Sequence, residues 1–330
     1  MARQKKGREI SGIIVLNKPL GLSSNQVLQK IKWLLGAKKA GHTGALDPMA
    51  SGVLPLCFGD ATKFSQVLLE STKGYITTCK LGEIRSTGDQ DGEVLATSPV
   101  PEFDADSIEI ILQNFRGLIT QVPPMYSALK HEGRPLYELA RKGIELDLKA
   151  LKERQVTIHS LKILAIRQNL GEIDLEVVCS KGTYIRSLVE DIGNEVGCGA
   201  YVSMLHRNKA GPFSEVQMVD YQVLLDLEES HPVVAERHKV MDEMLIHSAE
   251  AIPDWPKIEL TLAEGHKILH GQRVKTSFPL TPQVQLWVNA PDGVVFVGVG
   301  DITDNGTLIP KRVFQVTLPT ERPIEIPEKD

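Results

Sequence analysis

Residues 41–55 read Gly41-His42-Thr43-Gly44-Ala45-Leu46-Asp47-Pro48-Met49-Ala50-Ser51-Gly52-Val53-Leu54-Pro55. Three glycines and two prolines surround a single carboxylate, Asp47, between two apolar runs. Glycine permits backbone conformations that other residues resist, and proline fixes its own. The stretch therefore predicts a rigid loop that holds Asp47 in one pose, as functional loops do.

The surroundings of Asp47 narrow its chemistry. No second carboxylate or suitable histidine lies at ligand spacing nearby, which disfavours a metal. A Ser/His/Asp triad is also disfavoured, because one short loop can hardly align His42, Asp47 and Ser51. No G-K-[ST] follows the glycines, as a phosphate-binding loop requires. Two interpretations remain: an ionised carboxylate presented to a substrate, or an aspartate that caps a turn or the next helix.

Three further side chains are candidates for a site. Arg186 falls in the first turn of an expected helix and could keep a lone aspartate ionised by bidentate pairing, or could form a surface salt bridge. Tyr75 could stack on a flat substrate or pack in the core. His42 could contact a phosphate or a base edge, or satisfy a buried hydrogen bond.

The apolar spacing predicts the elements around these residues. Strands are expected at 13–16, 53–58, 75–81 and 172–179, and helices are expected to begin near Ser23, Ser107 and Ile185 and to end at Gly36, Gly117 and Gly193. After Ala251 the pattern changes to short strands with prolines and hairpin turns at 291–293 and 304–306. We expect two domains, 1–251 and 252–330, the second a small β domain.

Amino-acid composition restricts the possible functions less than the Asp47 stretch does. The net charge of -5 and the pI near 6.0 argue against a nucleic-acid partner. The charge is segregated, however, and the sequence allows either a basic face on an acidic body or scattered solvated charge. The four cysteines form no C-x-x-C pair and are interpreted as small buried hydrophobes. No apolar run is long enough to cross a bilayer, and residues 13–16 are too short for a signal-peptide core, so we expect a cytoplasmic protein.

Three motifs occur in order along the chain. They are Leu16-Asn17-Lys18-Pro19-Leu20-Gly21-Leu22-Ser23-Ser24, the Asp47 stretch quoted above, and Cys179-Ser180-Lys181-Gly182-Thr183-Tyr184-Ile185-Arg186-Ser187-Leu188. With them the chain resembles the bacterial TruB-type tRNA pseudouridine synthases over nearly its whole length. The resemblance implies an α+β pseudouridine synthase fold, with a mixed, largely antiparallel central sheet flanked by helices and loops, and a small C-terminal PUA-like RNA-binding β domain.

The resemblance also implies an activity and its residues. The enzyme would be an isomerase that converts uridine 55 in the T-arm of tRNA to pseudouridine. Asp47 would be the catalytic aspartate, Tyr75 would stack on the flipped uracil, and Arg186 would pair with Asp47. Four residues would bind or support the substrate: Lys18 beneath the catalytic loop, His42 against the RNA near the base, and Tyr184 and Leu205 as pocket walls.

Residues 122–151 match the family's thumb insertion, which clamps the RNA stem-loop. Lys130 and Arg141 would be among its RNA-binding residues. One departure is His206, which stands where many relatives carry a second arginine, and this puts a phosphate contact there in doubt. The insertion favours a stand-alone enzyme without an obligate protein partner, and the resemblance implies a monomer.

The expected reaction breaks the N1–C1′ glycosidic bond, turns the uracil and rejoins it through C5, so it needs no cofactor. Positive charge develops at the sugar, as in glycoside hydrolysis. Asp47 could stabilise that charge, attack C1′ or promote loss of the 2′ proton, and the sequence leaves these three roles open. A noncatalytic RNA-binding protein on the same scaffold and a guide-RNA-dependent enzyme that needs partner proteins are the alternative functions.

Overall fold

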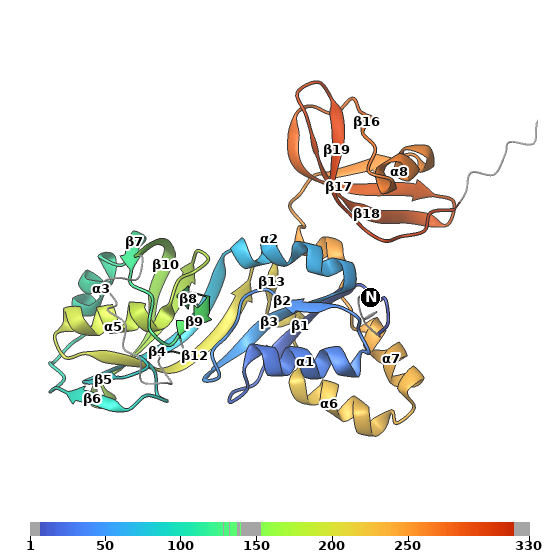
Figure 1. The fold of residues 1–330 in the computed structure, drawn as a ribbon. Helices are drawn as coiled ribbons and strands as arrows, with labels where there is room; N and C mark the ends of the chain where they lie inside the picture. Colours follow the sequence, from blue (N-terminus) through green and yellow to red (C-terminus); the bar gives the residue numbers. More distant parts are fainter. Residues whose placement is uncertain (1–6, 128, 132, 137–138, 140–152, 320–330) are drawn as a thin grey trace, which may run out of the picture.

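The computed structural model describes residues 7–127, 129–131, 133–136, 139 and 153–319. A large body built around one long sheet is joined to a smaller β unit through a short linker (Figure 1). Residues 1–6 lie outside the described residues. No helix in the described ranges has both the length and the apolar character needed to span a bilayer.

The large sheet carries ten strands within the described residues, in the order β14-β1-β3-β12-β4-β11-β10-β7, with β2 paired to β3 and β13 paired to β12. The β1–β14 and β3–β12 pairs are parallel and the others are antiparallel. The predicted mixed, largely antiparallel sheet is therefore confirmed. Its strands are β1 (Gly12–Lys18), β2 (Ala40–His42), β3 (Ala50–Phe58), β4 (Lys73–Leu81), β7 (Gly117–Gln121), β10 (Arg154–Arg167), β11 (Glu172–Cys179), β12 (Ala200–Ala210), β13 (Phe213–Ser214) and β14 (Val219–Asp220).

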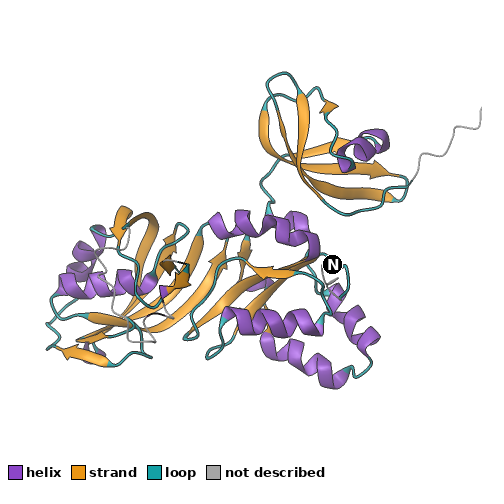
Figure 2. Ribbon diagram, viewed as in Figure 1, coloured by secondary structure: helices purple, strands orange, loops and turns teal. Residues whose placement is uncertain are grey.

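Around β1 and β3 the sheet buries both of its faces, because side chains alternate along a strand and enter different cores. In β1, Ile14 and Leu16 belong to one core while Ile13 and Val15 belong to another. Residues of α1 (Ser24–Leu34), α3 (Ala105–Gln113), α5 (Ile185–Val196), α6 (Tyr221–Ser230) and α7 (Val234–Glu243) pack into the first core. Residues of η1 (Gly59–Phe64) and α2 (Ser65–Glu70) pack into the second (Figure 2).

Three helix boundaries differ from the predictions. Helix α3 ends at Gln113, and Gly117, where its end was predicted, is instead the first residue of β7. Asp104, rather than Ser107, is the N-cap of α3; Ser107 is the third helical residue and completes a reciprocal capping box with Asp104. Helix α5 continues through Gly193 and ends at Gly197, whose φ of 92° suits glycine. Gly193 serves close packing instead, since a Cβ there would lie 2.3 Å from the Ala200 nitrogen of β12.

The C-terminal unit is a five-stranded sheet in the order β15-β17-β18-β19-β16, covered by α8 (Leu262–Leu269). Its strands are β15 (Lys257–Leu260), β16 (Val274–Lys275), β17 (Thr281–Ala290), β18 (Gly293–Ile302) and β19 (Thr307–Val313). The body and this unit share the second core, where the rings of Phe64 and Phe314 lie 5.6 Å apart. The division into 1–251 and 252–330 stays a prediction.

Short elements complete the chain. The hairpin of β5 (Glu83–Arg85) and β6 (Val94–Thr97) follows β4, and the hairpin of β8 (Lys130–His131) and β9 (Arg134–Pro135) follows β7. The 3₁₀ turns are η3 (Gln168–Leu170), η4 (Glu215–Gln217) and η5 (Ser248–Ala251). The predicted thumb, 122–151, includes β8 and β9, but residues 128, 132, 137–138 and 140–151 lie outside the described residues.

Candidate active site

The loop that carries Asp47 is held from behind by buried groups. Lys18, at the end of β1, is fully buried and donates from Nζ to the carbonyl oxygens of Pro19 (2.6 Å) and Ala50 (2.7 Å). Ser24 Oγ exchanges hydrogen bonds with the backbone of Leu46, at 2.7 Å and 3.0 Å. Burial lowers the pKa of Lys18 to about 8, and the charge of Asp47 opposes the fall. These contacts fix the loop on both sides of Asp47.

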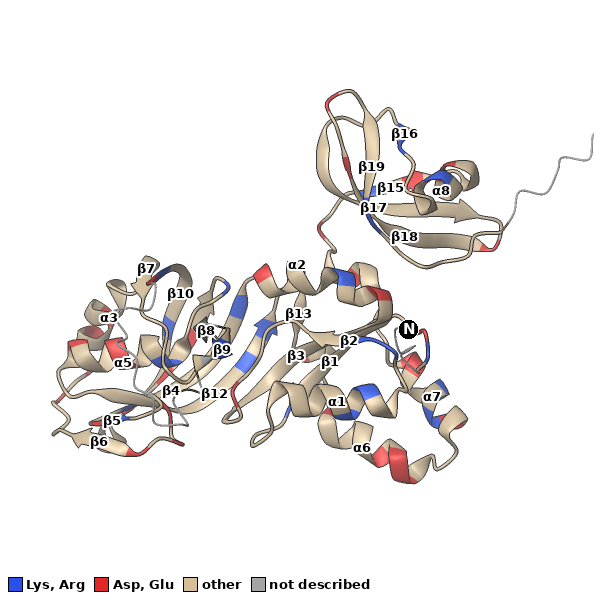
Figure 3. Ribbon diagram, viewed as in Figure 1, with Lys and Arg blue, Asp and Glu red and all other residues tan. Residues whose placement is uncertain are grey.

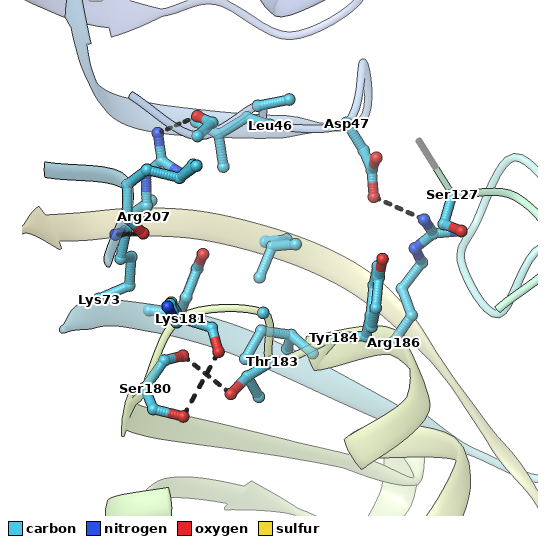
Figure 4. A pocket seen from close by; sticks show the side chains of 17 residues that line it. Leu46, Asp47, Lys73, Ser127, Ser180, Lys181, Thr183, Tyr184, Arg186 and Arg207 are labelled. Atoms are coloured by element: carbon cyan, nitrogen blue, oxygen red, sulfur yellow. Dashed lines mark hydrogen bonds and ion pairs between the residues drawn. The ribbon is translucent and has the colours of Figure 1, made fainter. Parts of the chain in front are cut away.

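Asp47 and Arg186 form an ion pair, with 2.8 Å between Oδ2 and Nη2 (Figure 4). The Arg186 side chain is 5% exposed, whereas that of Asp47 is 43% exposed. Loss of solvent around the carboxylate raises the pKa of Asp47, and the charge of Arg186 acts against that rise. The pair thus consists of a buried cation that favours ionisation and a carboxylate that remains accessible.

Arg186 is fixed by further partners. Its Nη1 donates to the Thr87 carbonyl (2.7 Å) and its Nη2 to the Tyr126 carbonyl (2.8 Å). A second carboxylate, Asp89, is almost fully buried and places Oδ2 3.5 Å from Nη1. Asp89 is not among the residues predicted from the sequence. The acids between two glycines in Gly88-Asp89-Gln90-Asp91-Gly92 are a turn signal that could have identified it.

A cavity of about 280 Å³ opens beside this pair. Asp47, Tyr75, Tyr184, Arg186 and Leu205 all line it, so five of the predicted site residues are brought together from four separate segments. Lys73, Lys181 and Arg207 line it as well, and the strands around it carry Lys and Arg, whereas α6 carries acidic residues (Figure 3). Cationic side chains outnumber carboxylates in this lining, which suits a polyanionic substrate.

Four predicted residues are not among those that line the cavity. Lys18 lies behind the loop, as described above. His42 is half-buried in β2; burial lowers its pKa, and its Nδ1 has no hydrogen-bond partner among the described residues. Lys130 belongs to β8, with its side chain outside the described part of the chain, and Arg141 lies outside it altogether.

Two other observations bear on the chemistry. Within the described ranges, no group of three or more His, Cys, Asp and Glu side chains is arranged to hold a metal ion.

His206 lies between Ser51, whose Oγ is 2.8 Å from Nδ1, and Glu215, whose Oε1 is 2.9 Å from Nε2. The residue that departs from the family pattern is thus hydrogen-bonded within the protein.

Three family models match successive parts of the chain. The model described as TruB family pseudouridylate synthase (N terminal domain) matches residues 32–185. The tRNA pseudouridylate synthase B C-terminal domain matches residues 186–249, and the model described as Pseudouridine synthase II TruB, C-terminal, matches residues 256–314.

Curated relatives match almost end to end. The chain is 48% identical to tRNA pseudouridine synthase B of Pseudomonas putida (strain F1), over 96% of this chain and 99% of that one. It is 46% identical to tRNA pseudouridine synthase B of Pseudomonas aeruginosa (strain UCBPP-PA14), over 96% and 100%. The Nitrosococcus oceani protein of the same name is 44% identical, over 94% and 97%.

Solved structures show the same fold. A crystal structure of a Cbf5-Nop10-Gar1 complex contains a chain that is 25% identical, with a TM-score of 0.67, over 92% of this chain and 85% of that chain. A chain in the structure of an H/ACA RNP bound to a substrate RNA containing 2′-deoxyuridine is 23% identical, with a TM-score of 0.67, over 96% and 92%. The fold and the paired aspartate and arginine place the chain among the pseudouridine synthases, which are RNA-modifying isomerases. Within that class the chain belongs to the TruB family.

Proposed function

We propose that this enzyme converts uridine 55 in the T-arm of tRNA to pseudouridine. The observation that carries the proposal is the accessible Asp47 carboxylate, paired with a buried Arg186 at the edge of a basic cavity. The names of the relatives given above state that they act on tRNA. The excess of cations around the cavity suits an RNA backbone.

The site residues follow from this geometry as proposed roles. The target uridine leaves its stack, because chemistry on a base requires access that a folded RNA denies. Tyr75 stacks on the flipped uracil and offsets part of the unstacking cost, while Tyr184 and Leu205 form the walls of the base pocket. Asp47 acts at the ribose while Arg186 keeps it ionised. Lys18 holds the loop from behind.

The chemistry requires that water stay out. Cleavage of the N1–C1′ bond creates a sugar cation that water would trap as a hydrolysis product. Asp47 must be ionised whether it stabilises that charge, attacks C1′ or promotes loss of the 2′ proton. In each case the uracil rejoins through C5, so that the C5 hydrogen is released and N1 gains one. The reaction consumes no co-reactant.

The proposed RNA contacts outside the cavity are His42, Lys130 and Arg141. His42 would act as a neutral hydrogen-bonding group near the base, because its lowered pKa disfavours the charged form. Residues 122–151 would clamp the stem-loop with Lys130 and Arg141. We further propose that the enzyme works as a cytoplasmic monomer without an obligate protein partner, and that the 252–330 β domain is a PUA-like RNA-binding module.

The test uses purified protein alone and an unmodified T-arm stem-loop labelled with tritium at C5 of uridine. We expect release of tritium in proportion to uridine 55, and none from a stem-loop with cytidine at position 55. Binding without release would favour a noncatalytic RNA-binding protein. Release only after a guide RNA and partner proteins are added would favour the guide-dependent class, and either result would overturn the proposal.

A further inference from the structure

A second buried arginine, Arg207 on β12, connects the loop that carries Asp47 with β3, the strand that follows it. It is 1% exposed. Its Nε donates to the carbonyl of Val53 (2.7 Å), and its Nη2 donates to the carbonyl of Gly44 (3.1 Å). Gly44 precedes Asp47 and Val53 follows it, so one guanidinium fastens both sides of the segment that presents the carboxylate.

The same arginine is also placed beside Tyr75. Strand β12 lies between β3 and β4, and Arg207 is in register with Gly52 on one neighbour and with Tyr75 on the other. At Gly52, with φ of 103°, a Cβ would lie 2.3 Å from the Arg207 carbonyl oxygen, so only glycine allows this approach. Burial raises the pKa of Tyr75, and the charge and hydrogen bond of Arg207 oppose the rise.

The positive charge of Arg207 is energetically unfavourable in its buried position. Among the described residues, no carboxylate oxygen comes within 4.0 Å of its guanidinium, which is paired with carbonyl groups instead. Two more buried cations, Lys18 and Lys73, lie close enough for the Arg207 charge to act on them. The pKa of each is lowered to about 8, mainly by burial and further by the charge of Arg207. A buried cation without a counter-ion is unfavourable, so its retention calls for a role that uses the charge.

We propose that Arg207 is a positioning residue for the isomerisation: it locks the Asp47 loop against Tyr75, and its positive charge polarises the Tyr75 hydroxyl. The inference rests on the proposed function, since it assigns Tyr75 to the uracil and Asp47 to the ribose. Arg207 acts through these two residues. A neutral residue of similar length would fill the space but would supply neither the two forked donors nor the charge.

The activity test is a double-mutant cycle on full-length protein and tritiated tRNA under single-turnover conditions. We expect Arg207→Met to lower the rate of tritium release by about 100-fold, the scale for loss of one positioned donor, with little change in tRNA affinity. Arg207→Lys, which keeps the charge, should recover part of that loss. In a Tyr75→Phe background the effect of Arg207→Met should shrink to about threefold, because coupled residues are not additive. Lys209→Met, which removes an exposed charge two residues along the same strand, is the control and should leave the rate unchanged.

A second measurement needs no turnover. With 3-fluorotyrosine incorporated, the ¹⁹F resonance of residue 75 is assigned by its absence in Tyr75→Phe and titrated with pH. We expect Arg207→Met to raise the pKa of this fluorotyrosine and Lys209→Met to leave it unchanged.

Three results separate the possibilities. Inactive wild-type protein would overturn the proposed function while the titration still reports on Arg207. An active wild type with an unshifted titration would overturn the inference alone. An Arg207→Met effect of the same size with and without the Tyr75 hydroxyl would also overturn it, because Arg207 would then be a structural clamp only.

Discussion

Arg186 lies between two carboxylates of unequal exposure: Asp47 at 2.8 Å, with a side chain 43% exposed, and Asp89 at 3.5 Å, with a side chain 6% exposed. The buried carboxylate and two backbone carbonyls fix the guanidinium. The accessible carboxylate is then held by a cation that cannot move away. This asymmetry leaves Asp47 available to a substrate beside a cation that favours its ionised form.

Replacing Asp47 with asparagine removes the charge and keeps the shape. We expect Asp47→Asn to lower single-turnover tritium release by at least about 10³-fold, the scale for loss of an essential catalytic group. Thermal unfolding and tRNA binding should stay close to wild type, because the side chain is partly exposed and the loop is held by Lys18 and Ser24. Turnover near the wild-type rate would remove Asp47 from the mechanism.

Replacing Arg186 with lysine keeps a charge but loses the planar fork. One ammonium group cannot reproduce contacts with Asp47, Asp89 and two carbonyls at once. We expect Arg186→Lys to slow turnover by roughly 100-fold, or about 2.7 kcal/mol in the activation barrier. A silent substitution, measured by the same assay, would contradict the proposed role of the pair.

Substitution of Asp89 should slow turnover although Asp89 does not line the cavity. Asp89→Asn removes the buried counter-charge of Arg186, so the guanidinium is held less firmly against Asp47. We expect roughly a tenfold loss of turnover with nearly unchanged tRNA affinity, because the residue acts through Arg186. Asp91→Asn, at an exposed position two residues away, is the matched control and should be silent. Equal effects of the two changes would contradict this reading of the geometry.

Folding stability should fall as pH rises, because the partly buried Glu190 loses its proton. Burial raises its pKa from 4.5 to about 7, and the Arg186 charge opposes the rise. Between these two values the folded protein holds a proton that the unfolded chain has released, so folding is favoured at low pH and loses that contribution as pH rises through about 7. Glu190→Gln removes the titration. We expect its melting temperature to match wild type near pH 5 and to exceed it by a few degrees near pH 8.

The matched control for this prediction is Glu195→Gln, on the same helix at an exposed position. It should show no pH-dependent difference. A difference between Glu190→Gln and wild type that is the same at both pH values would contradict the prediction.

Local sequence patterns predicted most of the elements that build the site. Strand β11 and the entry of Arg186 into the first turn of α5 follow from apolar spacing and a turn signal, which depend on neighbours along the chain. The errors were local as well. Asp104 competed with Ser107 for the N-cap of α3, and Gly193 served close contact with β12 rather than a helix end.

The sequence by itself determined the loop that carries Asp47, the motif that carries Arg186 and the family to which the chain belongs, because each of these is written in a continuous run of residues. Only the tertiary structure decided that Asp89 holds Arg186 and that Arg207 joins the Asp47 loop to β3 beside Tyr75. These contacts depend on which strands pair and in which register. Register is set by which side chains each strand buries against segments far apart in the chain, and no local pattern records these partners.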